Sequence, residues 1–573
     1  MPPVIVENKR TRLIVTLLLV ISVLAVGVCV AKERFILIPL VAVALAGAYL
    51  LVFKVEWAMY LMALSTPFSI VLTDAEVNVG LSLPAELLMI ALTGLFFVRI
   101  LYDLKINPKL AYHPVSIAIY VYLFWIFVTS LTSEIPLVSF KFLASKIWFI
   151  TSSYFMVIQL MKKNTANWIR FFNCYAIGLA VVVLITTAKS LAVGLDSHSM
   201  HWIMEPFYND HTAYGCVLAF FLPLSIGLIF LPQNNLFHKL FYVALSCVFT
   251  VGLYCSFSRA AWISFVLAVG IWCIVKLKIK FSWVLAAALL FGGTFYYFAD
   301  EILYKMSRNS QDSSGKLTEH LQSITNISTD ASNVERLNRW NSAFGMIRER
   351  PVVGWGPGTY QFVYAPFQKP AYKTIITTDF GDGGNAHSEY IGPCAETGFV
   401  GLATVIALVV VSLYYGFRTY KRSKEPQTRI LVLSATLSLI TYFIHGALNN
   451  FLDTDKLALP FWSAFALIVM LNVLTEHPQD EKDKIFFDKD DSSFIDYTSV
   501  NESDNTPAQE DDDKSINSYK NLCIEATLIN EFIKEKQNIL FDEDYQKSYN
   551  EEFYTSLKSL GLLWKGFNWD KSS

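Results

Sequence analysis

The stretch from residue 334 to residue 401 is polar, yet hydrophobic segments precede it and its last residues enter another one. It begins with VERLNRWNSAFGMIRERP (334–351), continues with VVGWGPGTYQF (352–362) and ends with GGNAHSEYIGPCAETGFVGL (383–402). One large polar loop in an otherwise apolar chain is typical of a membrane protein that does its chemistry at the membrane surface. We therefore expect the functional residues in and around this loop.

The first part of the loop has the spacing of a short amphipathic helix, which we expect at 335–350. Apolar residues recur every three or four positions and so line one helix face: Leu337, Trp340, Phe344 and Ile347. Pro351 ends the pattern because proline lacks a backbone N–H. Trp and Arg on one helix suit a membrane interface, where the guanidinium reaches phosphate. An ordinary surface helix is the alternative.

The middle part, GWGPG at 354–358, predicts a shaped turn. Gly356 and Gly358 permit backbone conformations that other residues avoid, and the proline between them removes a hydrogen-bond donor. Such a turn can offer N–H groups to a phosphate. However, it has neither the lysine of a Walker loop nor the strand-and-helix context of a dinucleotide loop. A purely structural turn is the alternative.

The last part places His387 where the chain re-enters apolar sequence, with Asn385 before it and Glu389 after it. Glu396 follows Glu389 by seven residues, which predicts that both carboxylates lie two turns apart on one helix face. A histidine near a carboxylate at the membrane boundary is a candidate general base, because its charge changes near neutral pH. A structural histidine is the alternative.

The composition of the whole chain indicates the fold class. Of the 573 residues, 54% are hydrophobic and only 16% are charged, which excludes an ordinary soluble protein. We predict an all-α polytopic integral membrane protein with about 12–14 transmembrane helices, because helices satisfy their own backbone groups in lipid. The expected spans are 13–31, 35–53, 57–73, 84–102, 114–133, 140–161, 168–188, 212–231, 239–257, 260–275, 282–298, 390–416, 430–448 and 458–475.

Lysine and arginine in short loops predict the orientation. With a cytoplasmic N-terminus, the basic loops that contain Lys162, Lys276 and Arg418 face the cytoplasm, and the long polar loop faces outward. The first span is expected to be retained rather than cleaved. Four parts follow: a transmembrane bundle of about eleven helices at 1–298, the outer loop at 299–389, C-terminal transmembrane helices at 390–475, and an acidic, partly disordered cytoplasmic tail at 476–573.

Ionisable residues at the ends of apolar spans are further candidates, since charge is costly in lipid. Arg259 stands in the turn FSRAAW (257–262) and Lys146 near the outer end of its span. Asp210 lies in FYNDHTAYG (207–215), an outer loop that with His198, His201 and His211 has residue types that bind metals. A hydrogen-bonding or substrate-facing loop is the preferred interpretation of that set. Neither a zinc spacing nor a disulfide framework emerges from the cysteines.

Together these residues predict a site for an anionic, lipid-linked substrate on the outer face. Arg259, Arg336, Arg339 and Lys146 provide cations for a diphosphate, and arginine pairs with phosphate oxygens through two parallel hydrogen bonds. His387 provides a base for an incoming sugar hydroxyl. The diphosphate is already a good leaving group, so the protein has only to neutralise its developing charge.

The order of several motifs resembles the O-antigen ligase and polymerase superfamily of bacterial envelopes. Over about 200–475 the chain carries FYNDHTAYG, SRAAW, RLNRW ahead of RPVVGWGPGTY, NAHSEY, ETGFVG and HGALNNFLDTDKLALPFW. The resemblance implies a C-type membrane glycosyltransferase-like fold and a metal-independent, cofactor-free enzyme of lipopolysaccharide biosynthesis in the inner membrane. By position, His387 matches the loop histidine that activates the acceptor, Arg259 the arginine of the SR turn, and Arg336 or Arg339 the arginine before the glycine turn.

The implied reaction moves a glycan from undecaprenyl diphosphate to a lipid A core sugar on the periplasmic face. The expected partners are this donor, the glycan acceptor and membrane lipid, with no nucleic acid. The same loop chemistry serves O-antigen or exopolysaccharide polymerases and protein O-oligosaccharyltransferases, and a transporter or flippase of lipid-linked sugars is the alternative from another class. Ser388, where the superfamily often has Asn, and the acidic tail are departures that leave the acceptor open.

Overall fold

The computed structural model describes residues 38–74, 79–102, 107–194, 200–280, 293, 331–369, 377 and 384–477. All of them belong to one compact unit that covers 1–497. Among these described residues, ten helices are long and apolar enough to cross a membrane, and one two-stranded hairpin is the sheet structure present. The prediction of an all-α polytopic membrane protein is thereby confirmed. The expected span 13–31, the span 282–298 apart from Gly293, and nearly all of the tail lie outside the described residues.

The elements follow one another along the chain in two groups. The first group is α2 (Ile38–Phe53), α3 (Val55–Ser65), η2 (Thr66–Phe68), β1 (Ile70–Asp74), β2 (Val79–Leu83), α4 (Ala85–Tyr102), α5 (Pro108–Ala111), α6 (Pro114–Leu131), α7 (Pro136–Ile150), the π-helical turn η3 (Thr151–Phe155), α8 (Met156–Lys163) and α9 (Ala166–Val193). The second is α10 (Met200–Ile203), α11 (His211–Ile229), α12 (Leu236–Cys255), α13 (Arg259–Lys276), α17 (Ala331–Glu349), α18 (Tyr360–Val363), η4 (Ala365–Phe367), α19 (Ile391–Arg422), α20 (Pro426–His445) and α21 (Asp455–Glu476).

The predicted span 57–73 is wrong. Helix α3 has 11 residues and ends at Ser65, and Pro67 then lies in a 3₁₀ turn that leads into β1. A helix of that length rises about 16 Å, which is about half of the apolar thickness of a bilayer. Strands β1 and β2 pair antiparallel, with Leu72 opposite Leu81, so the backbone groups of this segment are satisfied without a helix.

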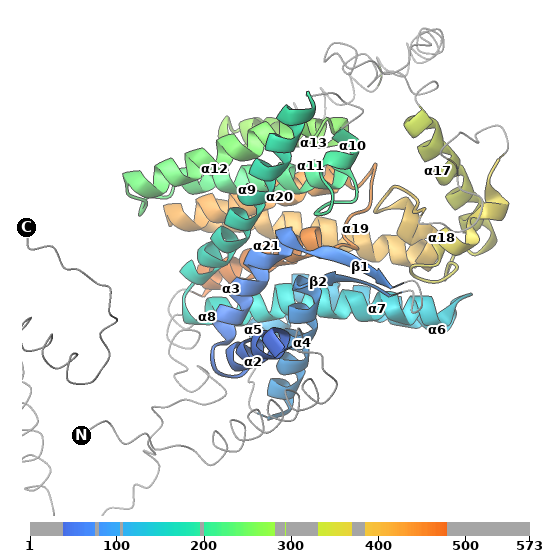
Figure 1. Ribbon diagram of the computed structural model, residues 1–573, viewed down its shortest axis with the longest axis horizontal. Helices are drawn as coiled ribbons and strands as arrows, with labels where there is room; N and C mark the ends of the chain where they lie inside the picture. The colour runs from blue at the N-terminus through green and yellow to red at the C-terminus, as the bar shows by residue number, and fades with distance from the viewer. Residues whose placement is uncertain are drawn as a thin grey trace, which may run out of the picture. The chain divides into compact units, whose positions relative to one another are not determined.

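Side-chain contacts show which helix ends lie together. At one end, Lys146 Nζ of α7 lies 2.6 Å from Asp453 Oδ1, just before α21. At the other end, Asn472 of α21 contacts His113 at 3.1 Å and donates to Thr419 of α19 at 2.9 Å. Figure 1 shows α17 and α18 beyond the first of these ends, next to the start of α19. We call the end with Lys146 and Asp453 the loop end of the bundle, and the end with Asn472 the opposite end.

Helix α21 forms the centre of the packing. Every one of its residues from Asp455 to Val473 is buried, and helices α7, α19 and α20 pack against it. Small residues let neighbouring helices approach: Gly227 of α11 packs against Ser434 of α20, and Gly416 of α19 against Thr436. Helix α21 also satisfies a buried polar group of α9, since Trp168 Nε1 donates to the backbone carbonyl of Ser463 at 3.0 Å.

Helix α19 is broken near its beginning, at Gly398, which has φ 72° and ψ −175°. The break interrupts helical hydrogen bonds inside an apolar segment, so other parts of the chain must replace them. Trp125 Nε1 of α6 donates to the carbonyl of Thr397 at 2.8 Å, and the N–H of Phe399 donates to the carbonyl of Pro351 at 2.8 Å. The start of α19 is therefore held by α6 and by the large loop.

Replacing Gly398 with alanine should destabilise the protein. The left-handed φ costs an L-residue about 1–3 kcal/mol, and the added Cβ would overlap the carbonyl oxygen of Val352. We expect a fall of several degrees in the midpoint of thermal unfolding in detergent, measured by tryptophan fluorescence. Gly270→Ala is the matched control, because a Cβ there meets nothing within 4 Å. Equal midpoints for the two variants would contradict this account of the break.

Candidate functional site

His387 is fixed by the local turn that precedes α19. Its backbone has φ 47°, a conformation that few residues other than glycine adopt. The side-chain oxygen of Asn385 accepts the N–H of His387 at 2.9 Å. Ser388 Oγ accepts the N–H groups of Tyr390 and Ile391 at 3.3 Å each, where the turn meets the start of α19. The turn holds the imidazole at the loop end of the bundle.

Charged residues from two other elements act on His387. Burial lowers the pKa of His387 to about 4, and the positive charges of Arg336 and Arg339 on α17 lower it further, while Asp210 and Glu335 act in the opposite direction. The imidazole is therefore neutral at physiological pH, as a general base must be before it takes a proton. The charges of both arginines thus act on His387, which the sequence grouped with them.

The two arginines of α17 have different surroundings. Arg339 is buried: its Nε donates to Glu335 Oε1 at 2.6 Å and its guanidinium lies 4.2 Å from the ring centre of Tyr364. The hydroxyl of Tyr360 donates to the Arg339 carbonyl at 2.7 Å. These contacts fasten α17 to the rest of the loop. Arg336 is half-buried, and its charge acts on His387.

Asp210 and Arg259 lie at the beginnings of neighbouring helices. Asp210 caps α11 by accepting the N–H of Thr212 at 3.0 Å. The next residue, His211, has Nδ1 2.9 Å from the carbonyl oxygen of Ser256, in the turn before α13. Arg259 is the first residue of α13, so this contact fixes the arginine turn relative to Asp210. Asp210 acts on His387, so this turn lies near the loop end of the bundle.

The histidines predicted as possible metal ligands in this region are only partly described. His198 lies outside the described residues, and the side chain of His201 is not described. Among the residues that the structure describes, no group of three or more His, Cys, Asp or Glu side chains is arranged to hold a metal ion. His211 instead contacts a backbone carbonyl, as the hydrogen-bonding interpretation of this loop predicts.

A second histidine, His445, belongs to the same region and was missed by the sequence analysis. It is the last residue of α20 and is 1% exposed. Its Nε2 lies 3.2 Å from Asn449 Nδ2, and its ring centre is 5.7 Å from that of Phe451. The charges of Arg336 and Asp210, which act on His387, also act on His445. A histidine at the end of an apolar helix was the available signal, although core histidines share it.

The GWGPG turn is a structural turn that lies on α19. The N–H of Trp355 donates to the carbonyl of Ala395 at 3.2 Å, and the N–H of Gly356 donates to the carbonyl of Glu396 at 2.8 Å. Glu396 Oε1 accepts the N–H of Tyr360 at 3.0 Å. The φ values of Gly354, Gly356 and Gly358 are 67°, 116° and 74°, which explains the three glycines. Two N–H groups that a phosphate cradle would need are therefore engaged with the protein.

Glu389 and Glu396 do not share one helix face, so that prediction is wrong. Helix α19 begins at Ile391, after Glu389, and the break at Gly398 follows Glu396. Glu389 instead turns toward α20, where it accepts hydrogen bonds from the hydroxyl of Tyr442 and from the N–H of Leu452, the latter at 3.0 Å. Burial raises the pKa of Glu389 above its ordinary value, and the charge of Asp453 raises it further.

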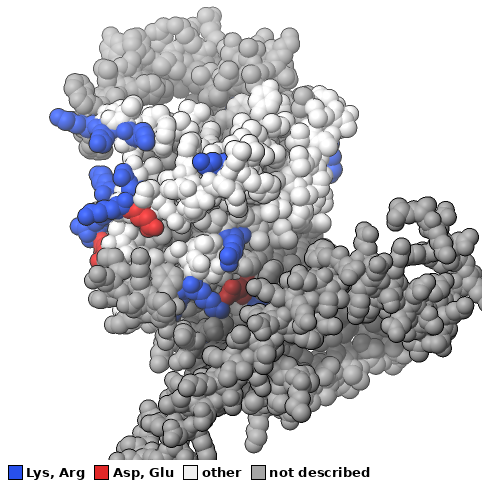
Figure 2. Space-filling model, turned by 90° about the vertical axis from the view of Figure 1, so that its left-hand side faces the viewer, with Lys and Arg blue, Asp and Glu red and all other residues white. Residues whose placement is uncertain are grey.

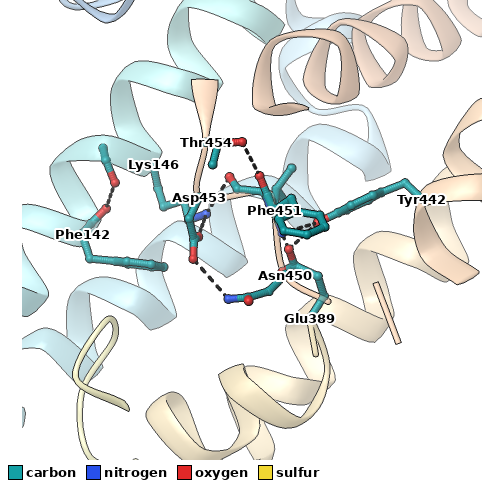
Figure 3. A network of polar contacts seen from close by, with 10 residues as sticks. Phe142, Lys146, Glu389, Tyr442, Asn450, Phe451, Asp453 and Thr454 are labelled. Atoms are coloured by element: carbon teal, nitrogen blue, oxygen red, sulfur yellow. Dashed lines mark hydrogen bonds and ion pairs between the residues drawn. The ribbon is translucent and has the colours of Figure 1, made fainter. Parts of the chain in front are cut away.

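Lys146 lies in the same network as Glu389 (Figure 3). It is 2% exposed, with its Nζ 2.6 Å from Asp453 Oδ1 and 3.1 Å from the carbonyl oxygen of Leu452. Its ammonium also lies 4.9 Å from the ring centre of Phe142. The structure thus gives Lys146 protein partners where the sequence analysis expected a diphosphate.

The predicted residues fall into three neighbouring groups. His387 shares its electrostatic environment with Arg336, Arg339 and Asp210, and His445 joins them. Glu389 and Lys146 form the network of Figure 3, and Glu396 holds the glycine turn. We call the first group, with Arg259 in the adjacent turn, the histidine–arginine site. It combines a neutral base with cations, which suits transfer of a group from a phosphate leaving group to a hydroxyl.

Comparison with known proteins identifies the region around this site. Residues 241–406 match the family model described as O-antigen ligase, which supports the resemblance to the O-antigen ligase-like superfamily. Residues 478–569 match the model described as eukaryotic translation initiation factor 3 subunit 7, a match that concerns the acidic tail alone. No curated protein matches the chain. The first match includes the predicted site residues Arg259, Arg336, Arg339, His387, Glu389 and Glu396.

Replacing Arg336 with glutamine should raise the pKa of His387 above about 4, because a positive charge that lowers it is removed. Diethyl pyrocarbonate acylates the neutral imidazole, so mass spectrometry of the His387 peptide across pH 4–7.5 reports the change. We expect the midpoint of reactivity to move to higher pH. Arg348→Gln, on an exposed position of the same helix, is the control and should keep the wild-type midpoint. A midpoint unchanged by Arg336→Gln would refute the electrostatic coupling.

Proposed function

We propose, from the premise that this chain belongs to the O-antigen ligase-like superfamily, that it transfers a glycan from undecaprenyl diphosphate to a hydroxyl of a lipid A core sugar. The observation that carries the proposal is the position of His387 in the turn before α19, at the loop end of a membrane-spanning bundle, where the charges of Arg336, Arg339 and Asp210 act on it. A membrane-embedded site suits this donor because its isoprenoid chain lies in lipid while its diphosphate reaches the cations.

His387 acts as the general base. Its neutral imidazole takes the proton of the acceptor hydroxyl as the oxygen attacks the anomeric carbon, and the bond between that carbon and the phosphate oxygen breaks. Undecaprenyl diphosphate leaves with the bonding electrons, and the arginines offset the negative charge that develops on it. Neither a metal ion nor a cofactor takes part in this scheme.

Donor binding would itself strengthen the base. In the free protein the charges of Arg336 and Arg339 lower the pKa of His387. A bound diphosphate would bring negative charge close to these arginines and so offset their effect, which raises the pKa of the imidazole. A base whose pKa rises toward the working pH accepts a proton more readily. His387 would then be most basic when donor and acceptor are both present.

The charge distribution supports a periplasmic position for the site. At the opposite end of the bundle the described residues include many basic side chains: Lys109, Lys162, Lys163, Lys276, Lys278, Lys280, Arg418, Lys421, Arg422 and Lys424. Figure 2 looks onto this end, where Lys and Arg outnumber Asp and Glu. By the positive-inside tendency we infer that this end faces the cytoplasm of a bacterial inner membrane.

The transfer assay with His387→Ala tests the proposal. Purified full-length protein receives an undecaprenyl-diphosphate oligosaccharide and lipid A core in the presence of a chelator. We expect wild-type protein to glycosylate the core and His387→Ala to lose at least about 100-fold in rate, within the usual contribution of a general base. His238→Ala, an exposed histidine at the start of α12, should retain the wild-type rate. Undiminished transfer by folded His387→Ala would disprove the assigned role.

The products of the same assay separate the related activities. Glycan on the lipid A core identifies a ligase. Longer lipid-linked chains formed without the core identify a polymerase, and glycan on an added protein acceptor identifies a protein O-oligosaccharyltransferase. Movement of intact donor between leaflets without transfer would indicate a transporter and would overturn the proposal.

Arg259 should contribute through the shape of its guanidinium as well as its charge. Arg259→Ala removes both, and we expect the KM for the donor to rise about tenfold or more, since a charge-assisted pair is worth about 1.5–3 kcal/mol. Arg259→Lys keeps the charge but loses the two parallel hydrogen bonds, so its KM should be intermediate. Lys276→Ala, at the other end of α13, is the control. Equal KM increases for the Ala and Lys variants would show that charge is irrelevant at this position.

A further inference from the structure

The segment from His445 to Thr454 joins α20 to α21 and carries the second histidine of the site. Glu389, only two residues after His387, contacts this segment at both of its ends. The N–H of Glu389 donates to the carbonyl of Gly446 at 2.7 Å, next to His445. Glu389 Oε1 accepts the N–H of Leu452 at 3.0 Å. One residue therefore connects the two histidine-bearing segments.

Further contacts fasten the far end of the segment, as Figure 3 shows. The hydroxyl of Tyr442 donates to Glu389 Oε1 and accepts the N–H of Phe451 at 3.3 Å. Lys146 Nζ binds Asp453 Oδ1 at 2.6 Å and the carbonyl of Leu452 at 3.1 Å, which ties the segment to α7. Thr454 Oγ1 donates to the carbonyl of Phe451 at 2.7 Å.

The groups that bond to Glu389 are buried, since Tyr442 is 2% and Leu452 8% exposed, whereas Asp453 and Thr454 are exposed. An apolar cavity of about 40 Å³ adjoins the network and is lined by Glu389, Tyr442 and Leu452 together with side chains of α6, α19, α20 and α21. Without the carboxylate, the N–H of Leu452 and the hydroxyl of Tyr442 would lose their acceptor in an apolar surrounding. A buried donor without an acceptor raises the free energy of the folded protein more than an exposed one does. We therefore expect the segment to shift until these donors form other hydrogen bonds.

We propose that Glu389 is a positioning residue for the glycan transfer, holding the His445 segment against the loop that carries His387 and so setting the separation of the two histidines. The inference rests on the proposed function. It also gives Lys146 a role, because the ion pair of Lys146 with Asp453 holds the same segment from the other side. Lys146 then supports the site from within the protein, in place of the donor binding that the sequence analysis expected.

The hydrogen-bond pattern separates positioning from proton transfer. The Tyr442 hydroxyl and the Leu452 N–H both donate a hydrogen bond to the same atom, Glu389 Oε1. Glutamine has an oxygen at that position and can accept both hydrogen bonds, but it cannot take up or release a proton at neutral pH. A positioning residue therefore tolerates Glu389→Gln and not Glu389→Ala, whereas an acid–base group tolerates neither.

The experiment measures kcat and the KM for the donor with purified full-length protein. We expect Glu389→Gln to stay within about threefold of wild type, and Glu389→Ala to lose about tenfold or more in kcat, which corresponds to about 1.4 kcal/mol, with little change in KM. Glu86→Gln is the matched control, because Glu86 is also buried and accepts a backbone N–H, that of Ser82 at 3.0 Å, in the hairpin region. Its kinetics should remain those of wild type.

Three kinetic outcomes would overturn the proposal. Equal losses in kcat for Glu389→Gln and Glu389→Ala would make the carboxylate a proton-transfer group or an essential charge. Wild-type kinetics in Glu389→Ala would show that the contacts do not matter for transfer. A rise in the KM for the donor with unchanged kcat would place Glu389 in donor binding and would also contradict the proposed role.

Hydrogen–deuterium exchange tests the same proposal without reference to activity. Glu389→Ala should increase exchange at least about tenfold in peptides that cover 446–453, and Glu389→Gln should leave it near the wild-type rate, because glutamine preserves the acceptor. Protected peptides in Glu389→Ala would refute the positioning role. If wild-type protein transfers no glycan to any acceptor, the proposed function fails, and the exchange result still decides whether Glu389 holds the segment.

Discussion

The absence of water in the bilayer is the constraint on which this structure depends, because each backbone N–H and C=O in the apolar region needs a partner within the protein. Helix α19 breaks at Gly398 and meets that requirement with groups from elsewhere: Trp125 of α6, the carbonyl of Pro351 and the N–H of Gly356. The break thus joins the large loop to the membrane-spanning bundle. As a result, His387, which comes directly before α19, has a defined position relative to α17.

The same constraint explains the chemistry of the histidine–arginine site. Burial disfavours the charged form of an imidazole, and two nearby arginines disfavour it further, so His387 is neutral and ready to accept a proton. The arginines would lower the pKa of His387 less once an anionic group neutralised their charge. Under the proposed function, such a site would be a weak base when empty and a stronger one when a diphosphate is bound.

Buried polar residues at the loop end serve different purposes although their sequence contexts look alike. Glu389 and Glu396 are seven residues apart, but the first holds the segment between α20 and α21 and the second holds the glycine turn. Lys146 and Arg339 are both buried and paired with a carboxylate, of Asp453 and Glu335 respectively. Arg336 acts on both histidines. Residue type and spacing show that burying such groups in lipid is costly. Their contacts are needed to distinguish a residue that stabilises the structure from one that takes part in the reaction.

The sequence by itself determined the fold class, most of the spanning helices, the position of the large loop and the candidacy of His387, Arg336 and Arg339. Hydropathy and residue type are local properties, and they suffice for these features. The tertiary structure alone decided that 57–73 forms a short helix and a hairpin, that Glu389 turns toward α20, and that His445 joins the site. These features depend on contacts between residues far apart in the chain, such as Lys146 with Asp453, and spacing within one segment carries no information about them.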